Sequence, residues 1–100
     1  MKLFKLTRTD DHVSPTYDYF DSIVVAAESE EAAKKVCPVE KVINIDGNFY
    51  REHYLNPGKY LPYSGVEWVA CDVWLRVYHL GEAAPYISEP CVILASFNAG

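Results

Sequence analysis

Histidine and cysteine offer the most versatile side-chain chemistry in this 100-residue chain, but their spacing favours no metal site. His12, His53 and His79 lie far apart, and none is within five residues of another histidine or of a cysteine. Structural zinc sites are typically built from such close pairs. Asp10, Asp11 and His12 are adjacent in a loop, and three consecutive side chains do not converge on one cation. The sequence predicts neither a metal site nor a cofactor.

Nucleophilic catalysis could use a thiol paired with an imidazole, here Cys71 or Cys91 with His79. No helix N-terminus or basic cluster is expected beside either thiol, so nothing would lower its pKa. An odd number of cysteines, completed by Cys37, is typical of reduced thiols. We expect Cys71 and Cys91 to pack as small apolar groups and His79 to be tucked against the core. An enzyme that uses His79 or His12 is the third-ranked functional hypothesis.

Acidic residues dominate the N-terminal third of a chain whose net charge is −5. Positions 9–33 contain no lysine or arginine and seven acids, Asp10, Asp11, Asp18, Asp21, Glu28, Glu30 and Glu31. Phosphate backbones are bound by lysine and arginine, so nucleic acid is disfavoured as a partner. Two interpretations stay open: the acids solvate an exposed face, or they occupy a basic groove on a partner protein.

Aromatic residues gather between positions 49 and 68, in a region rich in loop-forming residues. Tyrosine and tryptophan dominate the energetics of protein–protein interfaces. The candidate partner-binding residues are therefore Asp10, Asp11, Tyr50, Tyr54, Tyr60, Tyr63 and Trp68. The alternative is that these rings complete the core of a small domain that has one short helix.

The N-terminal half predicts two strands followed by a short helix. Residues 2–8 and 19–27 are expected to pair antiparallel through the turn-rich segment 9–18. Ser29 is a suitable N-cap, and Pro38 prevents the helix from continuing. So short a helix must pack on the sheet, and the residues expected to do so are Ala32, Ala33 and Val36.

The C-terminal half predicts a hairpin and two further strands. Asp46-Gly47 suits a two-residue turn between strands within 39–54. Residues 68–80 alternate, which predicts a strand whose core face carries Val69, Cys71, Val73, Leu75 and Val77. The final stretch, from residue 91, has the composition of a buried strand that holds the chain end in the core.

The order β-β-α-(ββ)-β-β predicts an α+β domain over residues 1–100. We expect a mainly antiparallel sheet of four to six strands, one short helix packed on one face, and a loop-rich aromatic insertion at about 39–67. The longest apolar runs are five residues, whereas a membrane span needs about 20. No signal-peptide pattern is present, so we expect residence in the cytoplasm.

Three segments resemble a known family: D-S-I-V-V-A-A-E-S-E-E-A at 21–32, G-E-A at 81–83, and the closing S-F-N-A-G at 96–100. The family comprises small, functionally uncharacterised proteins of bacteriophages, prophages and bacteria that end in S-F-N-A-G. The resemblance covers about half of the chain and implies a viral or mobile-element origin and residence in the host cytoplasm. It brings no catalytic residues.

Two non-enzymatic functions lead the hypotheses. The first is a small phage-type accessory protein that binds a host or phage protein, with inhibition of a bacterial defence complex through an acidic and aromatic surface as one form. The second is a virion or assembly component that forms a homo-oligomer through an edge strand or the aromatic patch.

Overall fold

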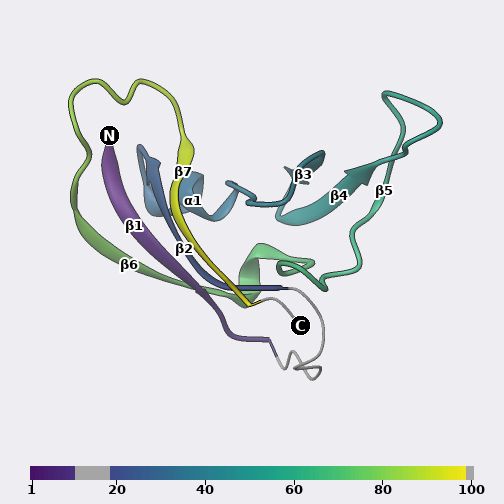
Figure 1. Ribbon diagram of the computed structural model, residues 1–100, viewed down its shortest axis with the longest axis horizontal. Coiled ribbons are helices and arrows are strands. Elements are labelled where there is room, and N and C mark those ends of the chain that lie inside the picture. The colour runs from purple at the N-terminus through teal and green to yellow at the C-terminus, as the bar shows by residue number, and fades with distance from the viewer. Residues whose placement is uncertain (11–18, 99–100) are drawn as a thin grey trace.

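A four-stranded antiparallel sheet forms one side of the molecule in the computed structural model, which describes residues 1–10 and 19–98. Its strands are β1 (Lys2–Arg8), β2 (Tyr19–Ala27), β6 (Leu75–Glu82) and β7 (Cys91–Asn98), in the order β6-β1-β2-β7 (Figure 1). β1 and β2 pair from Lys2↔Ala27 to Thr7↔Ser22, as predicted. Because side chains alternate along a strand, Phe4 and Leu6 share a face with Ile23 and Val25.

A second, three-stranded antiparallel sheet lies within the region predicted to be an aromatic insertion. It contains β3 (Val42–Ile45), β4 (Asn48–Glu52) and β5 (Tyr60–Pro62), in the order β3-β4-β5. The turn at Asp46 and Gly47 has φ values of 53° and 93°, so both residues adopt the positive φ that the sequence predicted there. The α+β class with mainly antiparallel strands is confirmed, and the described strands are divided between two sheets.

The helix α1 (Glu30–Lys34) follows β2 directly. Ser29 caps it as predicted, because its Oγ accepts a hydrogen bond from the backbone N–H of Ala32 at 3.1 Å. Ala33 is fully buried, and Ala32 and Val36 pack against the core. In the described residues no helix is long and apolar enough to cross a membrane.

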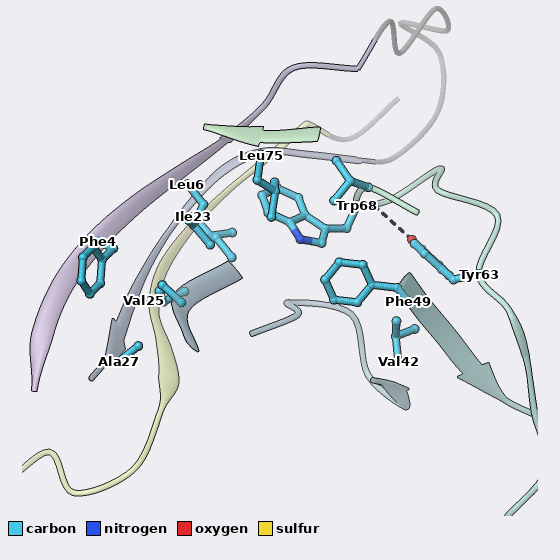
Figure 2. Packing of buried hydrophobic residues seen from close by; sticks show 12 residues of the cluster. Phe4, Leu6, Ile23, Val25, Ala27, Val42, Phe49, Tyr63, Trp68 and Leu75 are labelled. Carbon is cyan, nitrogen blue, oxygen red and sulfur yellow. Dashed lines mark hydrogen bonds between the residues drawn. The ribbon is translucent and has the colours of Figure 1, made fainter. Parts of the chain in front are cut away.

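One hydrophobic cluster joins the two sheets, as Figure 2 shows. The four-stranded sheet contributes Phe4, Leu6, Ile23, Val25, Ala27 and Leu75, and the second sheet contributes Val42 and Phe49. Trp68 and Val69 lie between them with no exposed surface. The second sheet is therefore held against the first by a shared core.

The predicted strand at 68–80 is wrong in its first half. Residues Asp72–Trp74 form a 3-10 turn, η1, and β6 begins only at Leu75. Trp68 and Val69 are consecutive and both buried, so these two positions do not divide into a core face and a solvent face as predicted. The chain crosses between the sheets here, and Val73, predicted to be in the core, is 69% exposed.

The final strand forms as predicted, but it is not buried. β7 pairs with β2 alone and is an outer strand of its sheet. Ile93, Leu94 and Phe97 are 45%, 67% and 47% exposed, and β2 is the one neighbour of β7 among the described strands. Apolar composition predicted the strand correctly, while its place in the sheet left the side chains in solvent.

Candidate functional site

The connection between β4 and β5 lies at the end of the second sheet farthest from the first (Figure 1), and it carries the exposed Tyr54. The connection is held by its own hydrogen bonds: the N–H of His53 donates to the carbonyl oxygen of Lys59 at 2.7 Å, and the N–H of Gly58 donates to Glu52 Oε2 at 3.2 Å. The Tyr54 ring stacks on the His53 ring, with 5.5 Å between centroids. Tyr54 is 84% exposed, while the connection that carries it is held by these hydrogen bonds.

An apolar strip covers the outer face of the second sheet. Ile43 lies opposite Tyr50 across β3 and β4, and Tyr50 lies opposite Pro62 across β4 and β5. Residues that are directly opposite, and those two positions away on one strand, share a face, so Ile45 and Tyr60 belong to the same strip. We call these residues, Ile43, Ile45, Tyr50, Tyr60 and Pro62, the outer strip.

The outer strip is unusually accessible for its composition. Ile43, Ile45 and Tyr60 are 39%, 43% and 37% exposed, and Tyr50 is half-buried. The inner face of the same sheet carries Phe49, which is only 1% exposed. The second sheet thus has two apolar faces, of which one packs on the core and the other contacts solvent. An apolar surface of this kind is typical of a protein-binding site.

A groove of about 590 Å³ lies beside Tyr54, and its walls include Arg51 and Leu61, which pair across β4 and β5 on the face opposite to the outer strip. Its walls also include Lys41, His53 and Tyr54, so it combines apolar surface with hydrogen-bond donors. Lys41 has a φ of 59°, a left-handed conformation that is strained for a residue with a side chain. Its carbonyl oxygen accepts a hydrogen bond from the N–H of Glu52 at 2.9 Å, which holds the strained residue in place.

Arg51 is the most constrained charge in the groove. Its Nη2 contacts Glu67 Oε1 at 2.9 Å, and its guanidinium lies 5.5 Å from the centroid of the Tyr63 ring. Both partners of this ion pair are partly exposed, so the pair contributes little to stability. Its effect is to orient the guanidinium at the groove wall.

Two of the predicted partner-binding residues are corrected by the structure. Tyr63 and Trp68 are 5% and 0% exposed, and both rings point into the core (Figure 2). The Oη of Tyr63 accepts hydrogen bonds from the backbone N–H groups of Glu67 and Trp68, each at 3.0 Å. A small domain needs large side chains to fill the space between two sheets, and these two rings serve that purpose.

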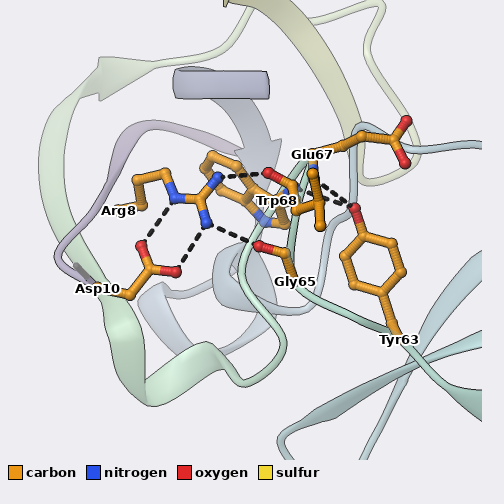
Figure 3. Close-up of polar contacts among 7 residues, drawn as sticks. Arg8, Asp10, Tyr63, Gly65, Glu67 and Trp68 are labelled. Carbon is orange, nitrogen blue, oxygen red and sulfur yellow. Dashed lines mark hydrogen bonds and ion pairs between the residues drawn. The ribbon is translucent and has the colours of Figure 1, made fainter. Parts of the chain in front are cut away.

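Asp10, another predicted partner-binding residue, forms an ion pair within the fold. The guanidinium of Arg8 donates two hydrogen bonds to the Asp10 carboxylate, from Nε to Oδ1 and from Nη2 to Oδ2, each at 2.7 Å (Figure 3). The same guanidinium donates to the carbonyl oxygens of Gly65 and Val66, at 2.9 and 3.1 Å. The Arg8 side chain is only 5% exposed, so Asp10 neutralises a nearly buried charge. Asp11 and His12 lie outside the described residues.

The described acids of the 9–33 segment do not form one continuous face. Asp21 lies in β2, whereas Glu28, Glu30 and Glu31 follow the far end of that strand. Seven residues separate Asp21 from Glu28, which is about 23 Å at the usual rise of a strand. These charges therefore lie at two separate places on the molecule.

The cysteines and His79 show no nucleophilic arrangement in the described part of the chain. All three thiols are unpaired, and burial raises the pKa of Cys37 to about 11, which keeps this thiol protonated at neutral pH. His79 was expected to be tucked against the core and is instead exposed, with its ring centroid 5.3 Å from that of Phe4. Across residues 1–10 and 19–98, no three His, Cys, Asp or Glu side chains are grouped to hold a metal.

Sequence reasoning missed Arg8 and the two isoleucines of the outer strip. The V-I-N-I segment of β3 alternates, and the inward position of Val42 places Ile43 and Ile45 outward. That signal was present in the sequence, but nothing there showed that this sheet would have a solvent-facing side. The role of Arg8 depends on carbonyl groups nearly sixty residues away.

No protein-family model, curated protein or solved structure matches this chain.

Proposed function

We propose that this chain is a small, non-enzymatic protein-binding domain, and that its partner docks on the outer strip and on Tyr54. The observation that carries the proposal is the exposed apolar outer face of the second sheet, with an exposed tyrosine that stacks on His53 at its end. Burying Ile43, Ile45 and Tyr60 against a partner would remove apolar surface from water, which favours association. The groove that Tyr54 lines would offer hydrogen-bond donors from Arg51 and Lys41 to a partner that docks on Tyr54.

The resemblance to bacteriophage and prophage proteins supplies the context of the proposal: a phage-type accessory protein that binds a host or phage protein. Inhibition of a bacterial defence complex is one form that this activity would take. The proposal rests on the second sheet and not on the acidic segment, because Asp10 is occupied by Arg8 and the other described acids are dispersed.

Affinity capture from a bacterial lysate, followed by titration of the purified partner, tests the proposal. Tyr54→Ala and Ile45→Ser each remove apolar contact at the proposed surface. At interface hot spots such truncations cost about 2 kcal/mol or more, so we expect the affinity to fall about 30-fold. Both residues are exposed, so the melting temperature should not change.

Tyr86→Ala is the matched control. Tyr86 is 86% exposed, almost as much as Tyr54, but it lies on the connection between β6 and β7. We expect this variant to bind like the wild type. If no partner is captured, or if Tyr54→Ala and Ile45→Ser bind as tightly as the wild type, the proposed function is wrong. Equal weakening by Tyr86→Ala would place the binding surface elsewhere.

A further inference from the structure

The outward edge of β7 is an unused hydrogen-bonding surface. β7 pairs with β2 on one side only, so about half of its backbone N–H and C=O groups point away from the sheet. In the described residues, no other backbone hydrogen bond reaches β7 outside this pairing.

The other sheet edges carry features that discourage strand pairing. β5 has three residues and ends in Pro62, which has no N–H to donate. β3 has four residues and directly follows the strained Lys41. β6 carries Arg76 and Glu82, and its pairing with β1 contains a bulge. Proteins use short strands, proline, charges and bulges in this way to prevent association at sheet edges.

β7 is different from these edges. It has eight residues and contains no charged residue, proline or glycine. The molecule carries a net charge of −5, which opposes self-association in general, but none of that charge lies on β7. Two β7 strands can therefore face each other without repulsion between side chains. The exposed Leu94 and Phe97 would add apolar contact to the backbone hydrogen bonds.

We propose that β7 pairs antiparallel with β7 of a second copy of this chain, which gives a symmetric dimer with one continuous sheet. The sheet would contain four strands from each copy, in the order β6-β1-β2-β7-β7-β2-β1-β6. An antiparallel pair of identical strands has its two-fold axis perpendicular to the sheet, so corresponding faces of the two copies lie on the same side. This surface is separate from the outer strip, and the inference does not depend on the proposed function.

The register of the pairing is limited by a bulge. Val24 pairs with Leu94 and Val25 with Val92, so Ile93 is the extra residue on β7. A second irregularity in this pairing places its extra residue, Asp21, on β2, so residues 94–98 of β7 contain no bulged residue of their own, and the two-fold axis falls within them. Leu94 and Ser96 share the face opposite to the core, because their neighbour Ala95 pairs with Ile23, whose side chain is buried. With the axis at Ser96, the middle of 94–98, Ser96 faces Ser96 of the second copy, and Leu94 lies two positions away on the same face.

Sedimentation velocity of the full chain over a wide concentration range tests the dimer. In the double variant Leu94→Lys, Ser96→Lys, the lysines at position 96 lie directly opposite each other across the proposed interface, and those at position 94 are diagonal neighbours of them on the same face. Both side chains are exposed, so the monomer should keep its circular dichroism spectrum and melting temperature. We expect the wild type to dimerise with rising concentration and the double variant to stay monomeric.

The matched control is the double variant Val73→Lys, Leu80→Lys. These residues are 69% and 54% exposed and lie away from β7, so the control makes the same change in charge and should dimerise like the wild type. A wild type that is monomeric throughout, a β7 variant that still dimerises, or equal loss in the control would each overturn the proposal. So would species larger than a dimer, because the pairing uses up the edge of β7 in both copies.

Hydrogen exchange gives a second readout without any substitution. The outward N–H groups of β7 should exchange more slowly at high protein concentration, while those of β6, the opposite edge, should not change. Uniform slowing at both edges, or no slowing at β7, would contradict pairing through β7.

Discussion

The Oη of Tyr63 accepts a hydrogen bond from the backbone N–H of Trp68 at 3.0 Å, and the two rings close the space between the two sheets. The segment that carries Trp68 has no strand partner of its own at this point, so a side chain satisfies its backbone. This contact divides the aromatic residues at 49–68 into two groups. Phe49, Tyr63 and Trp68 stabilise the core, and Tyr50, Tyr54 and Tyr60 remain at least partly accessible.

Replacing Tyr63 with phenylalanine should destabilise the fold. The change keeps the ring but leaves the N–H groups of Glu67 and Trp68 without their acceptor. An unsatisfied buried group costs about 1–3 kcal/mol, and we expect the free energy of unfolding in urea to fall by that amount. Tyr60→Phe is the control: this ring is 37% exposed, and its hydroxyl should contribute less than about 0.5 kcal/mol. Equal effects of the two substitutions would contradict the structural role of Tyr63.

Stability should fall at alkaline pH. Burial raises the pKa of Tyr63 from 10.0 to about 12 and that of Cys37 from 9.0 to about 11. Between these values the folded protein holds protons that the unfolded chain has released, so stability decreases as the pH rises. The contribution is fully present below about pH 9 and is lost by about pH 12.

Urea denaturation at a series of alkaline pH values measures this loss. The double variant Cys37→Ala, Tyr63→Phe lacks both groups, so its lower stability should decline less steeply over the same range. A double variant whose stability falls in parallel with the wild type would show that other groups cause the alkaline loss.

Neutralising Asp10 should weaken the fold, in contrast to the partner-binding role that the acidic segment suggested. Asp10→Asn removes the charge that balances Arg8, whose side chain is 5% exposed. Hydrogen bonds to charged groups contribute about 1.5–3 kcal/mol, and we expect thermal unfolding to show a loss of this size. Glu89→Gln, an exposed acid in the connection before β7, should have little effect. If Asp10→Asn melts like the wild type, the contact with Arg8 does not stabilise the protein.

Features that depend on neighbours in the sequence were predicted well. The Ser29 cap, the positive φ at Asp46 and Gly47, and the pairing of β1 with β2 were all predicted and are present. Each is decided within a short segment of the chain. The helix cap needs a side-chain oxygen before the helix, the turn needs residues that tolerate positive φ, and the strand pairing needs two apolar strands that follow each other in the sequence.

The candidate site was only partly predictable. Exposure separates Tyr54 from Tyr63, yet both are tyrosines in a region rich in loop formers, and nothing local distinguishes them. Ile43 and Ile45 are of a residue type typical of the core, yet they are 39% and 43% exposed, because they lie on the face of their sheet opposite to the buried Val42 and Phe49. Whether an apolar side chain is buried depends on which elements pack against it.

The amino-acid pattern by itself determined most element types and their order, with β5 and the 3-10 turn at Asp72–Trp74 as the exceptions, because caps, turns and strand propensities act over a few residues. Only the tertiary structure decided that the apolar β7 lies at an edge of its sheet, that Asp10 neutralises Arg8, and that Trp68 fills the core between the two sheets. Each of these outcomes depends on contacts between segments far apart in the chain. Such contacts form when the sheets pack together, so they leave no local mark in the sequence.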